Sequence, residues 1–139
     1  MATYYKPYNS FIQIAAMKSR FPQFRVKQKG NLDIIFTGEL KVKDVYPSYT
    51  ISVHYRGDTY PSVKITKPSL VDDPPHFYKM LGEPCLYKPK NYHWDKRKLV
   101  ATDIVPWTAG WIYFYETWLR TDKWLGPEAE HDAPQKENL

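Results

Sequence analysis

A period-two alternation of apolar and polar residues between residues 24 and 65 constrains the fold more than any other feature. After the tight-turn pair Gly30-Asn31, one face of the chain carries Leu32, Ile34, Phe36, Leu40 and Val42, and most of the residues between them are polar. The pattern resumes at Ile51, Val53 and Tyr55, and after a turn at 56–58 it ends with Val63 and Ile65. Such alternation is typical of strands that bury one face, so the segment predicts a four-stranded antiparallel meander.

Helical spacing is found on both sides of this segment. Before it, Phe11, Ile14 and Ala15 share one helical face, and a polar residue at 9 or 10 can cap a helix that Pro22 would end. This predicts a helix over residues 10–20.

After it, Trp111, Tyr115 and Trp118 follow i, i+4, i+7 spacing behind Pro106, a residue suited to a first helical turn. This predicts a second helix over 106–121. A helix can pack on the buried face of a meander, so the expected fold class is α+β with segregated elements.

Residues 67–104 lack sustained periodicity and contain Cys85, the single cysteine of the chain. One cysteine excludes a disulfide framework. A lone cysteine is commonly a small buried side chain, but the flanking Pro84, Glu83 and Lys88 favour an exposed position, where a thiolate would be a strong nucleophile. His76 lies nine residues upstream; it is either a general base or, as we favour, a residue that fixes the loop.

Several classes of function lack their sequence signatures. The four histidines and one cysteine show no zinc-ligand spacing, so we expect no metal site, and the glycine-rich motifs of nucleotide and dinucleotide binding are missing, so we expect no cofactor. No apolar run reaches the roughly 18 residues of a membrane span, and the N-terminus has no secretory apolar region. These features predict a cytoplasmic protein without a membrane partner.

Charge is unevenly distributed along the chain. The net charge is +5, but residues 127–139 carry four acidic residues against Lys136, which leaves the rest of the chain at about +8. A basic surface suits an acidic partner or a nucleic acid, but the aromatic run at 107–119 has no interleaved Lys or Arg and is better explained by helix-to-sheet packing. We expect one domain over 1–126 and a flexible acidic tail over 127–139.

The ordered set of elements and motifs resembles the ubiquitin-conjugating (E2) fold over residues 8–126. A helix precedes the meander, Tyr60-Pro61 follows the third strand, and the pair Cys85-Leu86 comes after His76, with Trp94 nine residues beyond the cysteine. The resemblance implies an α+β ubiquitin-conjugating fold with an N-terminal helix, a four-stranded antiparallel meander, a Cys-bearing loop and a C-terminal helix.

The chain is more closely similar to the bacterial E2-like proteins of cyclic-oligonucleotide anti-phage (CBASS) operons. The matching segments are Cys85-Leu86-Tyr87, residues 104–111 (IVPWTAGW), residues 115–119 (YETWL) and residues 124–131 (WLGPEAEH). The resemblance implies a stand-alone short form whose partner is the cyclic-oligonucleotide synthase (CD-NTase, a nucleotidyltransferase) of the same operon. Cys85 would take the C-terminal glycine of that cyclase as a thioester and pass it to a lysine of a target protein, which would regulate anti-phage signalling.

The resemblance also implies a set of site residues and one departure. His76 would support the Cys85 nucleophile, and Tyr87, Lys88, Asn91 and Trp94 would line the substrate site. The family's His-Pro-Asn motif reads His76-Phe77-Tyr78 here, one residue closer to the cysteine, so the Asn oxyanion donor is missing. Asn91 and the backbone amides near Cys85 are the candidate replacements. The missing Asn keeps open the alternative of a catalytically inactive E2-shaped scaffold that binds the cyclase. A nucleic-acid binder is a weaker third hypothesis.

Overall fold

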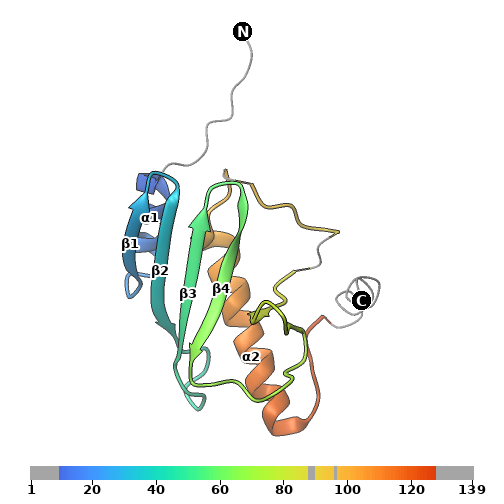
Figure 1. The fold of residues 1–139 in the computed structure, drawn as a ribbon. Coiled ribbons are helices and arrows are strands. Elements are labelled where there is room, and N and C mark those ends of the chain that lie inside the picture. The colour runs from blue at the N-terminus through green and yellow to red at the C-terminus, as the bar shows by residue number, and fades with distance from the viewer. Residues whose placement is uncertain (1–9, 88–89, 96, 128–139) are drawn as a thin grey trace.

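Four strands hydrogen-bond side by side in the order in which they occur in the chain (Figure 1). They are β1 (Arg25–Gly30), β2 (Asp33–Leu40), β3 (Tyr49–Arg56) and β4 (Thr59–Lys67), and each pair is antiparallel. The computed structural model describes residues 10–87, 90–95 and 97–127. The predicted meander is therefore confirmed, although β4 begins earlier than the apolar positions Val63 and Ile65 indicate. The predicted flexible tail falls almost entirely on residues outside the described ranges.

The sheet buries the face that the alternation predicts. On β2, Ile34, Phe36 and Leu40 are buried, and the residues between them are half-buried or exposed, except Gly38. On β3 the same alternation runs through Ile51, Val53 and Tyr55, and Phe36 lies opposite Val53 in the register. On the other face, the imidazole of His54 contacts the Asp33 carboxylate at 2.6 Å, so this histidine pairs across strands.

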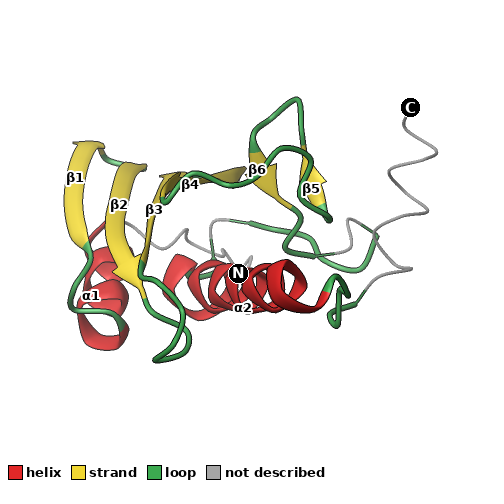
Figure 2. Cartoon of the chain, turned by 90° about the horizontal axis from the view of Figure 1, so that it is seen from below, coloured by secondary structure: helices red, strands yellow, loops and turns green. Residues whose placement is uncertain are grey.

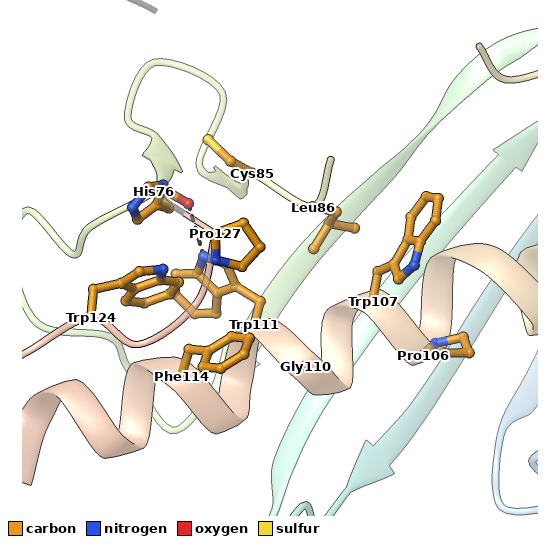
Figure 3. A pocket seen from close by; sticks show the side chains of 10 residues that line it. All are labelled: His76, Cys85, Leu86, Pro106, Trp107, Gly110, Trp111, Phe114, Trp124 and Pro127. Carbon is orange, nitrogen blue, oxygen red and sulfur yellow. Dashed lines mark hydrogen bonds between the residues drawn. The ribbon is translucent and has the colours of Figure 1, made fainter. Parts of the chain in front are cut away.

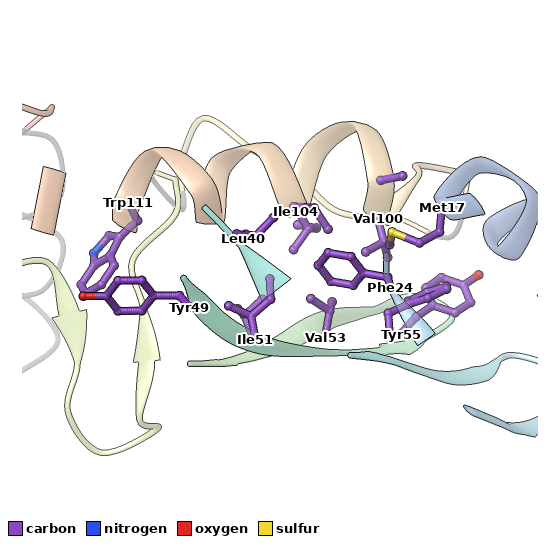
Figure 4. Packing of buried hydrophobic residues seen from close by; sticks show 14 of the residues in the cluster. Met17, Phe24, Leu40, Tyr49, Ile51, Val53, Tyr55, Val100, Ile104 and Trp111 are labelled. Carbon is purple, nitrogen blue, oxygen red and sulfur yellow. The ribbon is translucent and has the colours of Figure 1, made fainter. Parts of the chain in front are cut away.

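The helix α2 (Val105–Thr121) covers the buried face of the sheet (Figure 2). Its Trp111, Ile112 and Tyr115 enter the core with the apolar side chains of β2 and β3 (Figure 4). Pro106 lies in the first turn, as predicted, but a π-helical turn, η1 (Val100–Ile104), precedes the helix without a signal in the sequence. The predicted α+β class, with a helix packed on the meander, is confirmed.

A buried carboxylate joins α2 to β3. Glu116 is 3% exposed, accepts a hydrogen bond from the Tyr49 hydroxyl and forms an ion pair with Arg120 one turn later. Burial raises the pKa of Tyr49 well above its usual value, and the neighbouring Glu116 raises it further. The Tyr49 hydroxyl is therefore a hydrogen-bond donor at neutral pH, and the buried Glu116 carboxylate has both Tyr49 and Arg120 as partners.

The helix α1 (Ser10–Arg20) has the predicted bounds but buries a different face. Ser10, Gln13 and Met17 are buried, whereas Phe11 is 76% exposed and Ala15 is also exposed. The reason is Gln13, whose side chain donates to the Lys98 carbonyl at 2.7 Å and accepts from the Val100 amide at 3.2 Å. These bonds fix α1 against the start of η1, so the orientation of α1 is set by a polar residue.

The segment between β4 and α2 contains a second, smaller sheet. The two-residue strands β5 (Phe77–Tyr78) and β6 (Glu83–Pro84) pair as a hairpin beside α2 (Figures 1 and 2). The Glu83 carboxylate ties this hairpin to β4 by accepting bonds from the Ser62 hydroxyl (2.9 Å) and the Val63 amide (3.0 Å). Among the described residues, no helix has the length and apolar character needed to cross a membrane.

Candidate active site

Cys85 follows directly after β6, and the hairpin fixes its backbone. The Cys85 amide donates to the His76 carbonyl at 2.8 Å, which extends the β5–β6 ladder by one rung. The turn between the strands closes through the Gly82 amide, which donates to the Tyr78 carbonyl at 2.8 Å with Gly82 at φ +68°. Such a left-handed backbone is favourable for glycine. The hairpin therefore brings His76 opposite Cys85 through backbone atoms, and the expected role of the His76 ring in fixing the loop stays a prediction.

A tryptophan of α2 binds the same carbonyl. The indole N–H of Trp111 donates to the His76 carbonyl at 2.8 Å, so one oxygen accepts bonds from both Trp111 and Cys85. Trp111 is 3% exposed and stacks on Tyr115 with ring centroids 5.2 Å apart. The position of the cysteine is thus set by the packing of α2.

Cys85 is buried, and the prediction of an exposed cysteine is wrong. Its relative exposure is 3%. The prediction treated the Pro-rich segment as irregular surface chain, but β6 pairs with β5 there and the hairpin lies against α2. A buried thiol is protected from solvent and from reagents, so any chemistry at Cys85 requires an opening of its surroundings.

A hollow of about 240 Å³ lies between Cys85 and α2 (Figure 3). Its lining is mostly apolar and aromatic: His76, Cys85, Leu86, Pro106, Trp107, Gly110, Trp111, Phe114, Trp124 and Pro127. Gly110 leaves a gap on the α2 side, because a Cβ atom added there would meet no other atom within 4 Å. The hollow can accommodate a narrow, apolar or backbone-like group next to the cysteine.

The chain that follows α2 folds back over this hollow. The Trp124 ring lies 4.8 Å from the His76 ring and 5.9 Å from Trp111, measured between centroids. Gly126 permits this path, since a Cβ there would approach Phe114 to 2.7 Å. We call residues 122–127 the covering segment, because it brings Trp124 and Pro127 into the lining of the hollow.

Removal of the Trp124 ring is expected to expose Cys85. The Trp124→Ala variant loses aromatic contacts to His76, Trp111 and Phe114. Loss of these contacts weakens the hold of the covering segment on the hollow. The open form, in which this segment has moved away, should become about tenfold more populated. Alkylation of the single cysteine by iodoacetamide, followed by intact mass, should accelerate by about that factor at fixed pH. Leu125→Ala is the matched control because Leu125 is 63% exposed in the same segment. An unchanged rate in Trp124→Ala would show that the covering segment does not limit access.

A second hollow, of about 270 Å³, lies between the hairpin and β4. Its lining includes Arg56, Tyr60, Tyr78, Glu83 and Tyr87. The Tyr87 ring lies 5.9 Å from that of Tyr60 and continues into an aromatic cluster with Tyr92 and Trp107. Burial raises the pKa of Tyr87, with smaller contributions from the nearby Tyr60, Tyr78, Glu83 and Cys85. Leu86 lines both hollows, so the cysteine segment separates them.

The other residues expected at the site are spread over different environments. Trp94 is 1% exposed, packs edge-on against Tyr55 and donates to the Gly57 carbonyl at 2.9 Å, so it is a core residue. Asn91 is exposed and lines neither hollow. Lys88 lies outside the described residues. Of the four expected substrate-binding residues, the structure brings Tyr87 near Cys85, and it gives Trp94 a structural position.

Sequence reasoning missed three aromatic residues at the site. Tyr78 is a diagonal neighbour of Cys85 across the hairpin, and Trp111 and Trp124 line the hollow. The pairing of β5 with β6 places Tyr78 beside the cysteine, but two-residue strands leave no periodic signal in the sequence that would predict it. Within the described part of the chain, no group of three or more His, Cys, Asp or Glu side chains could hold a metal ion.

The chain matches a known protein family. Residues 13–132 match the family model E2-CBASS, described as Type II CBASS E2 protein. The matched range covers α1 from Gln13 onward, both sheets, α2 and the hollow beside Cys85. A search of curated proteins gives no match.

Proposed function

Because the chain belongs to the Type II CBASS E2 protein family, we propose that it is an E2-like transferase in which Cys85 carries an acyl group as a thioester. The observation that supports this most directly is the position of Cys85 at the edge of an aromatic hollow, with its backbone fixed by β5 and α2. On this proposal, the meander, the cysteine segment and α2 form a ubiquitin-conjugating fold.

The proposed reaction has two steps. In the first, the Cys85 thiolate attacks the carbonyl carbon of an activated C-terminal glycine, a C–S bond forms and the activating group leaves. The glycine must arrive as an acyl-adenylate or as a thioester on another carrier, because a free carboxylate has no adequate leaving group. In the second, a lysine amine attacks the thioester carbonyl; a C–N bond forms, the C–S bond breaks, the amine loses a proton and Cys85 is regenerated as a thiolate.

The acyl donor that we propose is the C-terminal tail of the cyclic-oligonucleotide synthase of the same operon. The hollow beside Cys85 has room for a slim tail, since its walls are aromatic and its gap at Gly110 has no side chain. The end of the tail must reach past the Cys85 backbone, because the sulfur points away from Trp111 and Phe114. A glycine-ended peptide presents little more than backbone there, and a bulkier ending would meet Trp111 or Phe114. Transfer to a lysine would then modify a target protein and regulate anti-phage signalling.

The experiment that tests this proposal is a search for the covalent adduct. Purified chain, synthase and an activating extract are incubated, and intact mass spectrometry should show an adduct that thiol reductants release. Gly110→Leu places a side chain in the hollow, and its Cβ meets no clash there, so the adduct yield should fall at least about tenfold. An unchanged circular dichroism spectrum checks that the variant is folded. Tyr113→Leu, at a 39% exposed position of α2 outside the hollow, is the control. Equal yields from both variants would contradict occupation of the hollow by the tail.

A second candidate function is a scaffold of E2 shape that binds the synthase without chemistry. The observation that favours it is the burial of Cys85, which is 3% exposed. A scaffold would bind the synthase with equal affinity whether or not the cysteine is present. Binding measurements and adduct measurements on the same cysteine variant therefore separate the two functions.

A further inference from the structure

The register of the β5–β6 hairpin places Tyr78 and Cys85 on the same side of the ribbon. Tyr78 pairs with Glu83, and Cys85 follows Glu83 by two residues, so their side chains share one face. Tyr78 and Cys85 are thus diagonal neighbours across the hairpin, a separation that an aromatic side chain can span. Cys85 is among the groups that raise the pKa of Tyr78, so the two side chains lie close enough to interact. Figure 3 shows the sulfur of Cys85 pointing away from Trp111 and Phe114.

The Tyr78 hydroxyl keeps its proton in the neutral pH range. Burial raises the pKa of Tyr78 to about 12, and the charge and hydrogen bond of Cys85 contribute to the same shift. Below that pH the O–H group is a donor, and a thiolate is an acceptor with no proton of its own. The bond is therefore stronger when Cys85 is ionised than when it is a thiol.

Two other titratable groups on this hairpin have contacts elsewhere in the fold. The His76 ring packs against Trp124, and the Glu83 carboxylate is bonded to Ser62 and Val63 of β4. Tyr87 lies near Cys85, but burial and its other neighbours contribute more to its raised pKa than Cys85 does. Tyr78 carries an O–H donor, and the hairpin register places it on the same face as Cys85.

We propose that the Tyr78 hydroxyl donates a hydrogen bond to Cys85 Sγ and thereby stabilises the thiolate, which gives Tyr78 a catalytic role at the nucleophile. The thiol proton passes to solvent, Tyr78 keeps its own proton, and no covalent bond to Tyr78 forms or breaks. The role in catalysis rests on the proposed transferase function, but the hydrogen bond and its effect on the sulfur do not. Tyr78 occupies the third position of the motif that begins at His76, where the resemblance to E2 enzymes implies an asparagine.

The test is the pH profile of Cys85 alkylation in the full chain. Iodoacetamide reacts with the thiolate, and the single cysteine makes intact mass an unambiguous readout. Tyr78→Phe removes one oxygen atom, so we expect the midpoint of the profile to rise by about one pH unit and the rate at pH 7 to fall about tenfold. Tyr113→Phe removes a hydroxyl at an exposed site of α2 and should reproduce the wild-type profile.

The profile separates the proposed role from a structural one. A hairpin that had only been loosened would react faster at every pH, with an unchanged midpoint. A Tyr78→Phe midpoint that equals the wild-type value, or lies below it, would overturn the proposal. If the midpoint rises while the wild-type chain forms no adduct with the synthase, the role of Tyr78 stands and the transferase function fails. If the adduct forms and the midpoint does not move, the transferase function stands and the proposed role of Tyr78 fails.

Discussion

Substitution of Cys85 by alanine is expected to abolish the covalent adduct with the synthase. The yield should drop by about a thousandfold or more, because the nucleophile that defines the covalent route is gone. The side chain lost is small, and the bonds that fix the local backbone, Cys85 amide to His76 carbonyl and Trp111 indole to the same oxygen, remain. The effect should therefore appear in the adduct assay and leave thermal unfolding nearly unchanged.

Cys85→Ser is the informative partner of that variant. A serine oxygen in the same place would hold the acyl group as an oxyester, which aminolysis breaks more slowly than a thioester. The serine adduct should persist in the presence of thiol reductants, whereas the wild-type adduct should be released. Full phage protection by Cys85→Ala, together with unchanged binding of the synthase, would reject the transferase and support the scaffold.

Trp111→Ala is expected to cost the fold about 3–5 kcal/mol, the usual range for loss of a large buried aromatic side chain. Trp111 is 3% exposed, stacks on Tyr115 and donates to the His76 carbonyl. Urea denaturation followed by circular dichroism measures this change in the free energy of unfolding. The same variant should lose the adduct, because the hairpin that carries Cys85 loses its bond to α2.

Two further variants divide the effect of Trp111 into packing and hydrogen bonding. Trp111→Phe keeps most of the aromatic packing and loses the N–H, so it should cost about 1 kcal/mol from the missing bond, plus a smaller packing loss. Trp107→Ala removes a tryptophan that is 36% exposed on the same helix and should cost clearly less than Trp111→Ala. Equal costs for the two alanine variants would mean that the contact of Trp111 with the hairpin adds little to stability.

The parts of the fold that the sequence predicts are those with long, regular patterns. The alternation on β2 and on β3 is regular because α1 and α2 cover one face of the sheet. Tyr115 and Trp111 repeat at helical spacing for the same reason. The face of α1 was mispredicted because a buried glutamine, Gln13, carries no hydropathy signal. Its importance depends on the Lys98 carbonyl and the Val100 amide, which are more than 80 residues away in the chain.

The sequence singles out Cys85 as the candidate nucleophile but does not predict its environment. The position of Cys85 after His76, and the likeness of the flanking segments to a known family, point to this residue. Its burial and its closeness to Tyr78 depend on a hairpin with two residues in each strand, and on Trp124 folding back from the end of α2. Contacts of that kind join distant segments through single side chains, so neither composition nor periodicity contains them.

The burial of Cys85 has a consequence for selectivity. When a reactive group is accessible in only a small fraction of molecules, its reaction with any reagent is slowed by that same factor. The exception is a reagent that binds the open form and thereby raises the population of that form. Small electrophiles and oxidants make few contacts with the covering segment and gain nothing from the open form. A protein tail that replaces the contacts of Trp124 within the hollow would offset the free-energy cost of opening by its own binding. A single thiol can thus remain reduced in a reactive solution and still respond to one macromolecular partner.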